Sequence, residues 1–206
     1  MTGGYQQLNF TPYYAGGTGS LSDVVITNNN TSSVNIFRQT GSDSWNVGAY
    51  TQEFKPPLTI EFNKAGPSSD NAQAYTMSGG LPTEMLSSMI ADPNESYHWG
   101  YNFYPVATNN PVQIYEKEWS AGTKTTYNVG SWTSGNLFRI SFYPDGRVKY
   151  YNVSQSSTPR RELDHSDFTF IRGQVNLYSR NLTTGGVSNF RVYLGKVWDG
   201  SSFVIP

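Results

Sequence analysis

The chain has no cysteine among its 206 residues, so disulfide bonds, thiolate metal sites and cysteine nucleophiles are all excluded. Charged residues are also scarce, at 14%, where soluble domains usually carry about a quarter. The formal net charge is −1, which gives no electrostatic basis for binding nucleic acid or an anionic membrane. No apolar run approaches the roughly 20 residues of a membrane-spanning helix, so we expect no membrane insertion.

The first residues, Met1 to Tyr5, contain neither the basic region nor the apolar region of a secretory signal. We therefore expect the protein to be made in a cytoplasm and used without export. The lack of cysteine does not by itself fix the compartment, because a large β-sandwich needs no disulfide to be stable.

Aromatic side chains and turn-forming residues are abundant. Aromatics make up 15% of the chain, and 20 glycines and 11 prolines punctuate it. After residue 136, Phe138, Ile140 and Phe142 alternate with more polar neighbours, so one face of a strand is apolar. Asp145-Gly146 then marks a tight turn before a second alternating run. This segment predicts a β-hairpin with one buried face.

Short runs of the same kind recur along the chain, separated by clusters of Gly, Pro, Asn and Ser, as in a sandwich or barrel. The predicted strands are 23–27, 33–38, 44–52, 58–63, 73–77, 97–103, 112–118, 124–129, 137–143, 147–153, 169–172, 174–180 and 188–194. Residues 82–90 are the one helical candidate. Alternation places these side chains in the core: Trp45, Ile60, Phe62, Phe138, Ile140 and Phe142.

The two ends of the chain differ from the middle. Residues 1–20 form an arm with a glycine-rich joint, and residues 195–206 form a short hairpin or tail that cannot be stable alone. Between them, residues 21–194 form one sandwich domain. Both ends carry aromatics, so we expect them to dock on their own domain or on a neighbouring subunit. The candidate assembly contacts are Tyr5, Phe10, Tyr13, Tyr14, Trp198 and Phe203.

A series of short motifs resembles concanavalin A-like jelly-roll domains of bacterial and phage surface proteins, and it covers residues 21–194 in the family's order. The motifs are Trp45–Tyr50, Leu58–Phe62, Met77–Leu81, Tyr97–Tyr101, Val112–Glu116, Leu137–Ile140 and Val148–Asn152. The C-terminal segment Lys196–Val204 is similar to Trp-Asp-Gly segments near the ends of phage tail and virion proteins. The resemblance implies an all-β, single jelly-roll β-sandwich.

The same resemblance implies a non-enzymatic bacteriophage virion protein with a lectin-like module for host-surface glycans. Its place would be the virion surface, on a tail, a fibre or the head exterior. Its partners would be other virion proteins and further copies of itself, with a trimer favoured by analogy with phage fibres and decoration proteins. Two alternatives remain: a head decoration or cement protein without a ligand, and a carbohydrate-active enzyme.

Catalytic and metal-binding patterns are weak. Glu116 and Glu118 are two apart on a predicted strand, as the carboxyl pair of a retaining glycosidase would be, but the further acids that flank such a pair are missing. The alternative interpretation is a solvated strand face. His98 and His165 fit neither a triad nor a zinc motif. Calcium could be bound near Asp70 or Asp92, but no full motif is present. We therefore expect no catalytic residue, no metal site and no cofactor.

Sugars bind aromatic rings by stacking, with nearby hydrogen-bonding groups fixing the orientation. Aromatics at predicted strand ends and loops are therefore candidate ligand contacts, although aromatics in sandwiches are often part of the core. The candidates are Trp99, Tyr101, Tyr104, Trp119 and Trp132.

Overall fold

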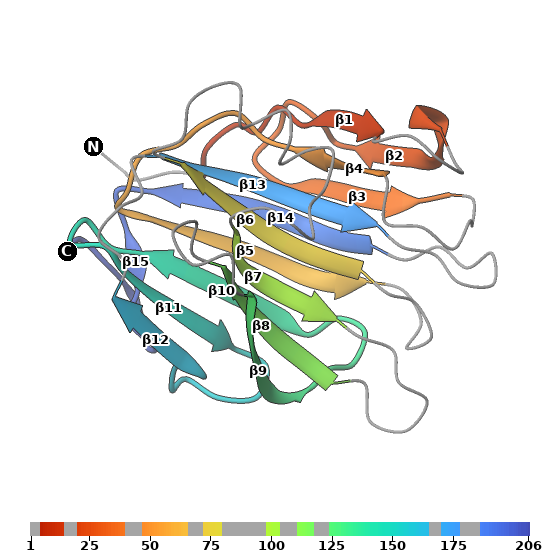
Figure 1. Cartoon of the computed structure of the whole chain (residues 1–206). Helices are drawn as coiled ribbons and strands as arrows, with labels where there is room; N and C mark the ends of the chain where they lie inside the picture. The colour runs from red at the N-terminus through yellow and green to blue at the C-terminus, as the bar shows by residue number, and fades with distance from the viewer. Residues whose placement is uncertain are drawn as a thin grey trace.

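The computed structural model describes residues 5–14, 20–39, 47–65, 72–79, 98–103, 111–117, 124–164, 170–177 and 186–206. Within them the chain is built from β-strands and one short 3₁₀ turn, Leu21–Asp23, which confirms the all-β prediction (Figure 1). The strands are β1 Thr11–Tyr14, β2 Val24–Thr27, β3 Val34–Arg38, β4 Val47–Tyr50, β5 Leu58–Ala65, β6 Ala72–Gly79, β7 His98–Phe103, β8 Pro111–Lys117, β9 Lys124–Ser131, β10 Leu137–Phe142, β11 Arg147–Asn152, β12 Arg161–Asp164, β13 Phe170–Leu177, β14 Gly186–Leu194, β15 Val197–Trp198 and β16 Phe203–Val204.

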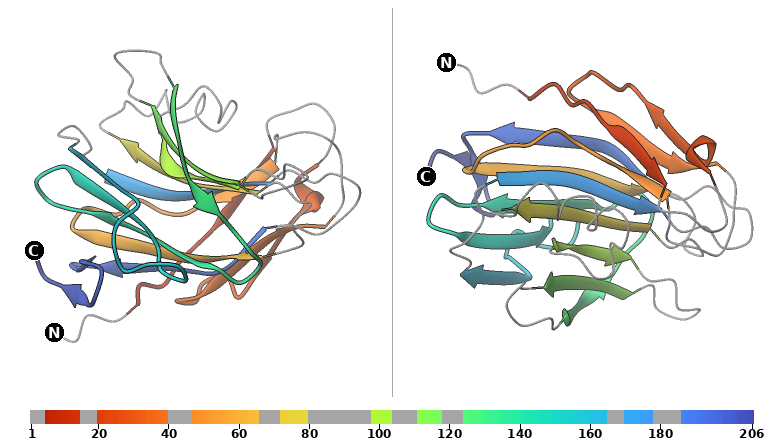
Figure 2. Two further views of the ribbon diagram at one scale, coloured as in Figure 1. Left: turned by 90° about the horizontal axis from the view of Figure 1, so that it is seen from below. Right: turned by 45° about the horizontal axis from the view of Figure 1, so that its top comes forward.

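The strands form two seven-stranded antiparallel sheets that pack face to face (Figure 2). The first sheet has the order β1-β4-β13-β6-β7-β8-β9, and the second has the order β12-β11-β10-β5-β14-β3-β2. Strands β15 and β16 pair only with each other. Strands distant in sequence therefore lie side by side in both sheets, as expected of a jelly roll.

The hairpin of β10 and β11 follows directly from its sequence. Phe138 pairs with Asn152 and Phe142 with Val148, so the alternating residues keep to one face. Gly146 has a φ of 89°, a conformation that glycine adopts without steric cost. The core prediction is confirmed for Ile60, Phe62, Phe138, Ile140 and Phe142, which are at most 1% exposed. Trp45 lies outside the described residues.

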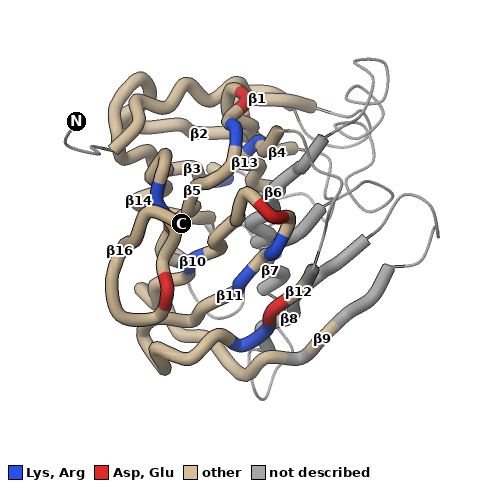
Figure 3. The backbone as a smooth tube through the Cα atoms, turned by 90° about the vertical axis from the view of Figure 1, so that its left-hand side faces the viewer, with Lys and Arg blue, Asp and Glu red and all other residues tan. Residues whose placement is uncertain are grey.

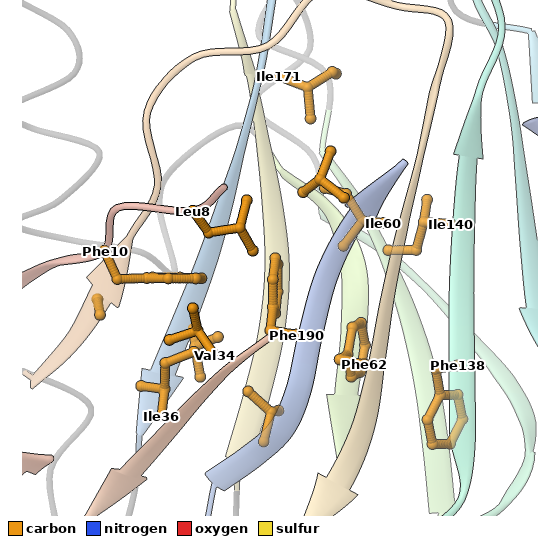
Figure 4. Close-up of a cluster of buried hydrophobic side chains, with 14 of the residues drawn as sticks. Leu8, Phe10, Val34, Ile36, Ile60, Phe62, Phe138, Ile140, Ile171 and Phe190 are labelled. Atoms are coloured by element: carbon orange, nitrogen blue, oxygen red, sulfur yellow. The ribbon is translucent and has the colours of Figure 1, made fainter. Parts of the chain in front are cut away.

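Stacked aromatic rings fill the space between the sheets (Figure 4). The Phe62 ring lies 5.9 Å from the ring of Phe138 and 5.9 Å from that of Phe190. Phe10 approaches Phe190 edge-on at 5.1 Å. Leu8 and Phe10 are both buried in this cluster, so this part of the predicted arm belongs to the core.

Asn152 interrupts this apolar interior. Its side chain is 1% exposed, and neither its amide nitrogen nor its amide oxygen has a hydrogen-bond partner. An unsatisfied buried polar group costs about 1–3 kcal/mol. We therefore expect Asn152→Leu to leave the free energy of unfolding unchanged or to raise it, as measured by urea denaturation.

The matched control is Gln174→Leu. Gln174 is equally buried but donates a hydrogen bond of 3.0 Å to the Tyr13 hydroxyl, so its replacement should destabilise the protein. A loss in Asn152→Leu as large as that in Gln174→Leu would contradict this interpretation.

The C-terminal hairpin of β15 and β16 packs on the second sheet. The backbone amide of Trp198 donates to the hydroxyls of Thr59 and Ser141, at 3.0 Å each. Asp199 shapes the hairpin turn, because its carboxylate accepts hydrogen bonds from the amides of Ser202 and Ser201, and these lower its pKa. The hairpin thus covers polar side chains of β5 and β10.

A charged cluster lies beside this hairpin. Glu61 has a side chain only 4% exposed, and its Oε2 lies 2.6 Å from an Arg139 guanidinium nitrogen. The Tyr193 hydroxyl donates to Oε1 at 3.1 Å, and Arg191 approaches the same oxygen at 3.4 Å. The Arg139 guanidinium lies 4.0 Å from the centre of the Trp198 ring. The C-terminal hairpin therefore covers the Glu61–Arg139 ion pair of the second sheet.

Apart from shifts of a few residues at strand ends, the predicted strands differ from the structure in one merged pair and two missed strands. Residues 169–172 and 174–180 were predicted as separate strands, but β13 runs without a break from Phe170 to Leu177. Strands β1 and β12 were not predicted. Both are four-residue edge strands, paired on one side only, and the proline of β1 and the charges of β12 hide the strand pattern. The helical candidate at 82–90 lies outside the described residues.

Candidate functional site

The first sheet has two faces, and Gly173 identifies the inner one. A Cβ atom on Gly173 would lie 2.5 Å from the Phe190 ring, so this position faces the second sheet. Ile171 and Val175, two residues before and after it, are fully buried in the core. Because side chains alternate along a strand, Arg172 and Gln174 belong to the opposite face, which we call the outer face.

The pairing register extends this assignment across the sheet. Gln174 pairs with Tyr75, Tyr75 with Gly100, Gly100 with Tyr115 and Tyr115 with Thr126. The other outer-face positions of these five strands carry Phe170, Arg172 and Asn176 of β13, Gln73, Met77 and Gly79 of β6, His98 and Asn102 of β7, Gln113 and Lys117 of β8, and Lys124 and Asn128 of β9. None of these positions in the five described strands is Asp or Glu. By register, residues with amide side chains and tyrosines therefore predominate at these positions of the sheet.

Tyr13 and Gln174 form the buried part of this face where β1, β4 and β13 meet. The Tyr13 ring crosses Gly48, whose hypothetical Cβ would lie 2.7 Å from the Tyr13 hydroxyl. The Gln174 amide reaches the same hydroxyl at 3.0 Å. Burial raises the pKa of the Tyr13 phenol, so the hydroxyl stays neutral at physiological pH.

Next to this pair, Glu53, Arg172 and Tyr50 form an accessible polar group. An Arg172 guanidinium nitrogen donates to Glu53 Oε1 at 2.7 Å, and the Glu53 side chain is 47% exposed. The Arg172 guanidinium carbon lies 5.6 Å from the centre of the Tyr50 ring. The Nε atom of Arg172 has no hydrogen-bond partner. This group presents a carboxylate, a guanidinium and an aromatic ring on one surface, as sugar-binding and sugar-cleaving sites do.

None of the predicted ligand contacts is at an outer-face position of the strands that the structure describes. Trp99 pairs with Thr76, the partner of Gly173, and Tyr101 pairs with Ala74, the partner of Val175, so both occupy inner-face rows. Trp132 is 1% exposed, and the Lys64 ammonium lies 4.5 Å from its ring centre. Tyr104 and Trp119 lie outside the described residues.

Of the predicted carboxyl pair, only Glu116 lies among the described residues. Glu116 pairs with Trp99 and therefore belongs to the row of Gly173, on the inner face. Glu118 lies outside the described residues. The outer-face positions of β8 instead carry Gln113, Tyr115 and Lys117.

The predicted assembly residues make contacts within the chain. Phe10 and Tyr13 are 2% and 5% exposed, and β1 continues the first sheet by pairing with β4. Tyr5 and Tyr14 are 48% and 38% exposed, and the Tyr5 ring lies 4.8 Å from that of Tyr193. From the C-terminal hairpin, Phe203 stacks on Tyr193 at 4.1 Å, and Trp198 covers Arg139. The homo-oligomer and the virion partners stay predictions.

The described residues contain no group of three or more His, Cys, Asp or Glu side chains placed to hold a metal ion. The stretches considered for calcium, near Asp70 and Asp92, lie outside them. Nor does any helix in the described part of the chain have the length and apolar character to cross a membrane.

No protein-family profile and no curated protein sequence matches the chain. Solved structures do. A Bacillus licheniformis β-glucanase is 13% identical, with 94% of this chain and 99% of that one covered and a TM-score of 0.58. The endo-β-1,3-glucanase of Pyrococcus furiosus is 16% identical, with coverages of 96% and 89% and a TM-score of 0.58. The PSpry domain of TRIM65 is 15% identical, with coverages of 90% and 89% and a TM-score of 0.53. At these identities the likeness establishes the jelly-roll fold.

These matches correct two predictions. The chain was predicted to be a non-enzymatic bacteriophage virion protein with a lectin-like module, and to have no catalytic role. The similar structures reported above are two glucanases and a PSpry domain, and none of these three is described as part of a phage particle. They favour the alternative of a carbohydrate-active enzyme. Motif order along the sequence indicated the fold, whereas the phage context rested on a nine-residue C-terminal segment, the aromatic arm and the lack of a signal sequence.

Proposed function

We propose that the protein is a carbohydrate-active enzyme that cleaves a polysaccharide bound across the outer face of the first sheet. The observation that carries this proposal is the extent of the likeness to glucanases, which spans nearly the whole of both chains. Fold alone does not assign a function, so the residues must also fit.

The outer face fits a polysaccharide in its chemistry. Tyrosine rings stack on sugar faces, and Asn, Gln and Arg side chains hydrogen-bond to hydroxyl groups. Among the side chains that the structure describes, Tyr50 and Arg172 offer both kinds of contact within one surface. A sheet face several strands wide suits an extended polymer better than a small molecule.

Cleavage of a glycosidic bond by hydrolysis requires two carboxyl groups, about 5–5.5 Å apart in retaining enzymes and about 6.5–9.5 Å apart in inverting ones. Glu53 brings one carboxylate to the outer face, held there by Arg172. The sequence has further acids in segments outside the described residues, among them Asp92, Glu95 and Glu118. We propose Glu53 as one of the two groups.

Glu53→Gln is expected to lower kcat about 100-fold or more, because it removes a general acid or base while keeping the side chain's size. The measurement is the release of reducing ends from a panel of soluble polysaccharides, with retention on the same polymers measured separately. Glu162→Gln is the control, since Glu162 is a similarly exposed carboxylate on the second sheet, 3.2 Å from Lys149.

Two results would contradict these proposals. Unchanged kcat in Glu53→Gln, or weaker retention without any fall in kcat, would remove Glu53 from the reaction. Wild-type protein that neither retains nor cleaves any polysaccharide in the panel would overturn the proposed function.

A further inference from the structure

The N-terminal segment, residues 5–14, is bound to the residue that precedes Glu53. The side-chain amide of Gln52 donates from Nε2 to the Gln7 carbonyl oxygen at 2.8 Å, and its Oε1 accepts a hydrogen bond from the Asn9 backbone amide at 2.9 Å. Gln52 therefore satisfies a carbonyl and an amide of the segment together, as the peptide group of a neighbouring strand would. This connects the segment directly to the stretch of chain that carries Glu53.

The N-terminal segment is itself held in place by the rest of the fold. The Leu8 amide donates to the Thr31 carbonyl oxygen at 2.8 Å, and the Leu8 carbonyl oxygen accepts from the Asn30 amide at 2.9 Å. The Asn29 side chain accepts from the Phe10 amide at 2.8 Å and donates to the Phe10 carbonyl oxygen at 2.9 Å. Leu8 and Phe10 are also buried in the core. The segment can therefore act as a rigid support for the side chains that bind it.

The same segment also supports the other side chains of the candidate site. Tyr50 lies on β4, which β1 extends by pairing, and the Tyr13 ring lies 6.4 Å from the Tyr50 ring. The Tyr13 hydroxyl accepts the hydrogen bond of Gln174, which follows Arg172 by two residues and shares its face of β13. Glu53, Tyr50 and Arg172 therefore each have a close neighbour that contacts the N-terminal segment.

These contacts with the N-terminal segment are neutral. Residues 5–14 contain no Lys, Arg, Asp or Glu, and the segment is drawn in tan in Figure 3. Salt screens interactions between charges, so it should leave the hydrogen bonds of Gln52 nearly unchanged. The pairing of Glu53 with Arg172, in contrast, should weaken as the ionic strength rises.

We propose that Gln52 is a positioning residue, which fixes the Glu53 carboxylate relative to a polysaccharide bound on Tyr50 and Arg172; this inference rests on the proposed function. Glu53 lies in the irregular stretch between β4 and β5, and its side chain is 47% exposed, so packing restrains it little. A reacting group displaced by about 1 Å can lose roughly 100-fold in rate. The two hydrogen bonds from Gln52 to a rigid support limit such a displacement.

The test replaces Gln52 by methionine, which is similarly long and unbranched but carries no amide group. We expect Gln52→Met to lower kcat about tenfold, with KM and retention on the polysaccharide changed less than about twofold, because the substrate contacts stay in place. The ratio of wild-type to variant kcat should be the same at low and high salt. In the double variant Gln52→Met/Glu53→Gln, kcat should be no lower than in Glu53→Gln alone, because Gln52 acts through Glu53.

Gln155→Met is the matched control. The Gln155 amide also donates to a backbone carbonyl, that of Ser131 at 2.8 Å, and also accepts one hydrogen bond, from Arg160 at 3.2 Å. Ser131 ends β9, five strands away from β4 in the sheet order, so kcat should stay within about twofold of wild type. Thermal unfolding checks that both variants are folded at the assay temperature. An equal fall in kcat in both variants would mean a general loss of stability and would overturn the inference.

The outcomes distinguish the positioning role from the proposed function on which it rests. Unchanged kcat in Gln52→Met, together with a loss in Glu53→Gln, would overturn the positioning role and leave the carbohydrate-active enzyme standing. A raised KM with unchanged kcat would also overturn it, because Gln52 would then contribute to binding. Wild-type protein that cleaves no polysaccharide in the panel would overturn the enzyme and the positioning role together.

Discussion

Phe138→Ala is expected to lower the free energy of unfolding by about 3–5 kcal/mol, the usual cost of removing a buried phenylalanine. Phe138 is fully buried, and its ring stacks on Phe62 at 5.9 Å. Phe62 in turn stacks on Phe190, so the cavity would open inside the ring stack that joins β10, β5 and β14. Close-packed neighbours can relax only partly into such a space.

The measurement is equilibrium unfolding in urea, with Leu21→Ala as the control. Leu21 is 52% exposed, so its truncation should change the free energy of unfolding by less than about 0.5 kcal/mol. A loss for Phe138→Ala below about 1 kcal/mol would mean that the face assignment of the β10–β11 hairpin is wrong.

Glu61→Leu is expected to cost about 3–5 kcal/mol, because removing one partner of a buried ion pair leaves the other charge uncompensated. Arg139, at 2.6 Å from Glu61, has a side chain only 11% exposed and is covered by the Trp198 ring. The variant would also leave the Tyr193 hydroxyl without its carboxylate acceptor. We expect the C-terminal hairpin to loosen, which protease cleavage near Trp198 would report.

Glu162→Leu is the control for this prediction. Glu162 also pairs with a cation, but it is 43% exposed, and such surface pairs contribute at most about 1 kcal/mol. The double variant Glu61→Leu/Arg139→Leu should recover part of the loss, since it removes both charges together. Equal effects of Glu61→Leu and Glu162→Leu would show that the hairpin does not bury the pair.

The elements that could be predicted from the sequence are those whose signals are local. The hairpin from 137 to 152 carries its alternation, its turn and its second strand within one short segment, and its core residues are buried as expected. Strands β1 and β12 escaped prediction because their place at a sheet edge depends on partners elsewhere in the chain.

The candidate site could not be predicted in the same way. Whether Trp99, Tyr101 or Glu116 belongs to the inner or the outer face depends on register with β6 and β13, which lie far away in sequence. Glu53 and Arg172 are separated by 119 residues and meet only because β4 pairs with β13. Aromatic type alone favoured Trp132, although its ring is 1% exposed and belongs to the buried core.

The contacts of the two terminal segments likewise depend on residues that lie far away in the sequence. Their aromatics indicated docking, and Phe10 and Trp198 do dock, on the sandwich of their own chain. The backbone amide of Trp198 donates a hydrogen bond to the Ser141 hydroxyl. In the sequence, Ser141 is simply a polar residue in an alternating strand. Only the fold brings it beneath the hairpin.

The most direct test is a crystal structure of the full chain with an oligosaccharide derived from the polymer that it retains best. We predict that the oligosaccharide lies on the outer face of the first sheet, in contact with Tyr50 and Arg172 and beside Glu53. An oligosaccharide bound only to the second sheet, or only beside the terminal segments, would contradict the outer face as the binding site.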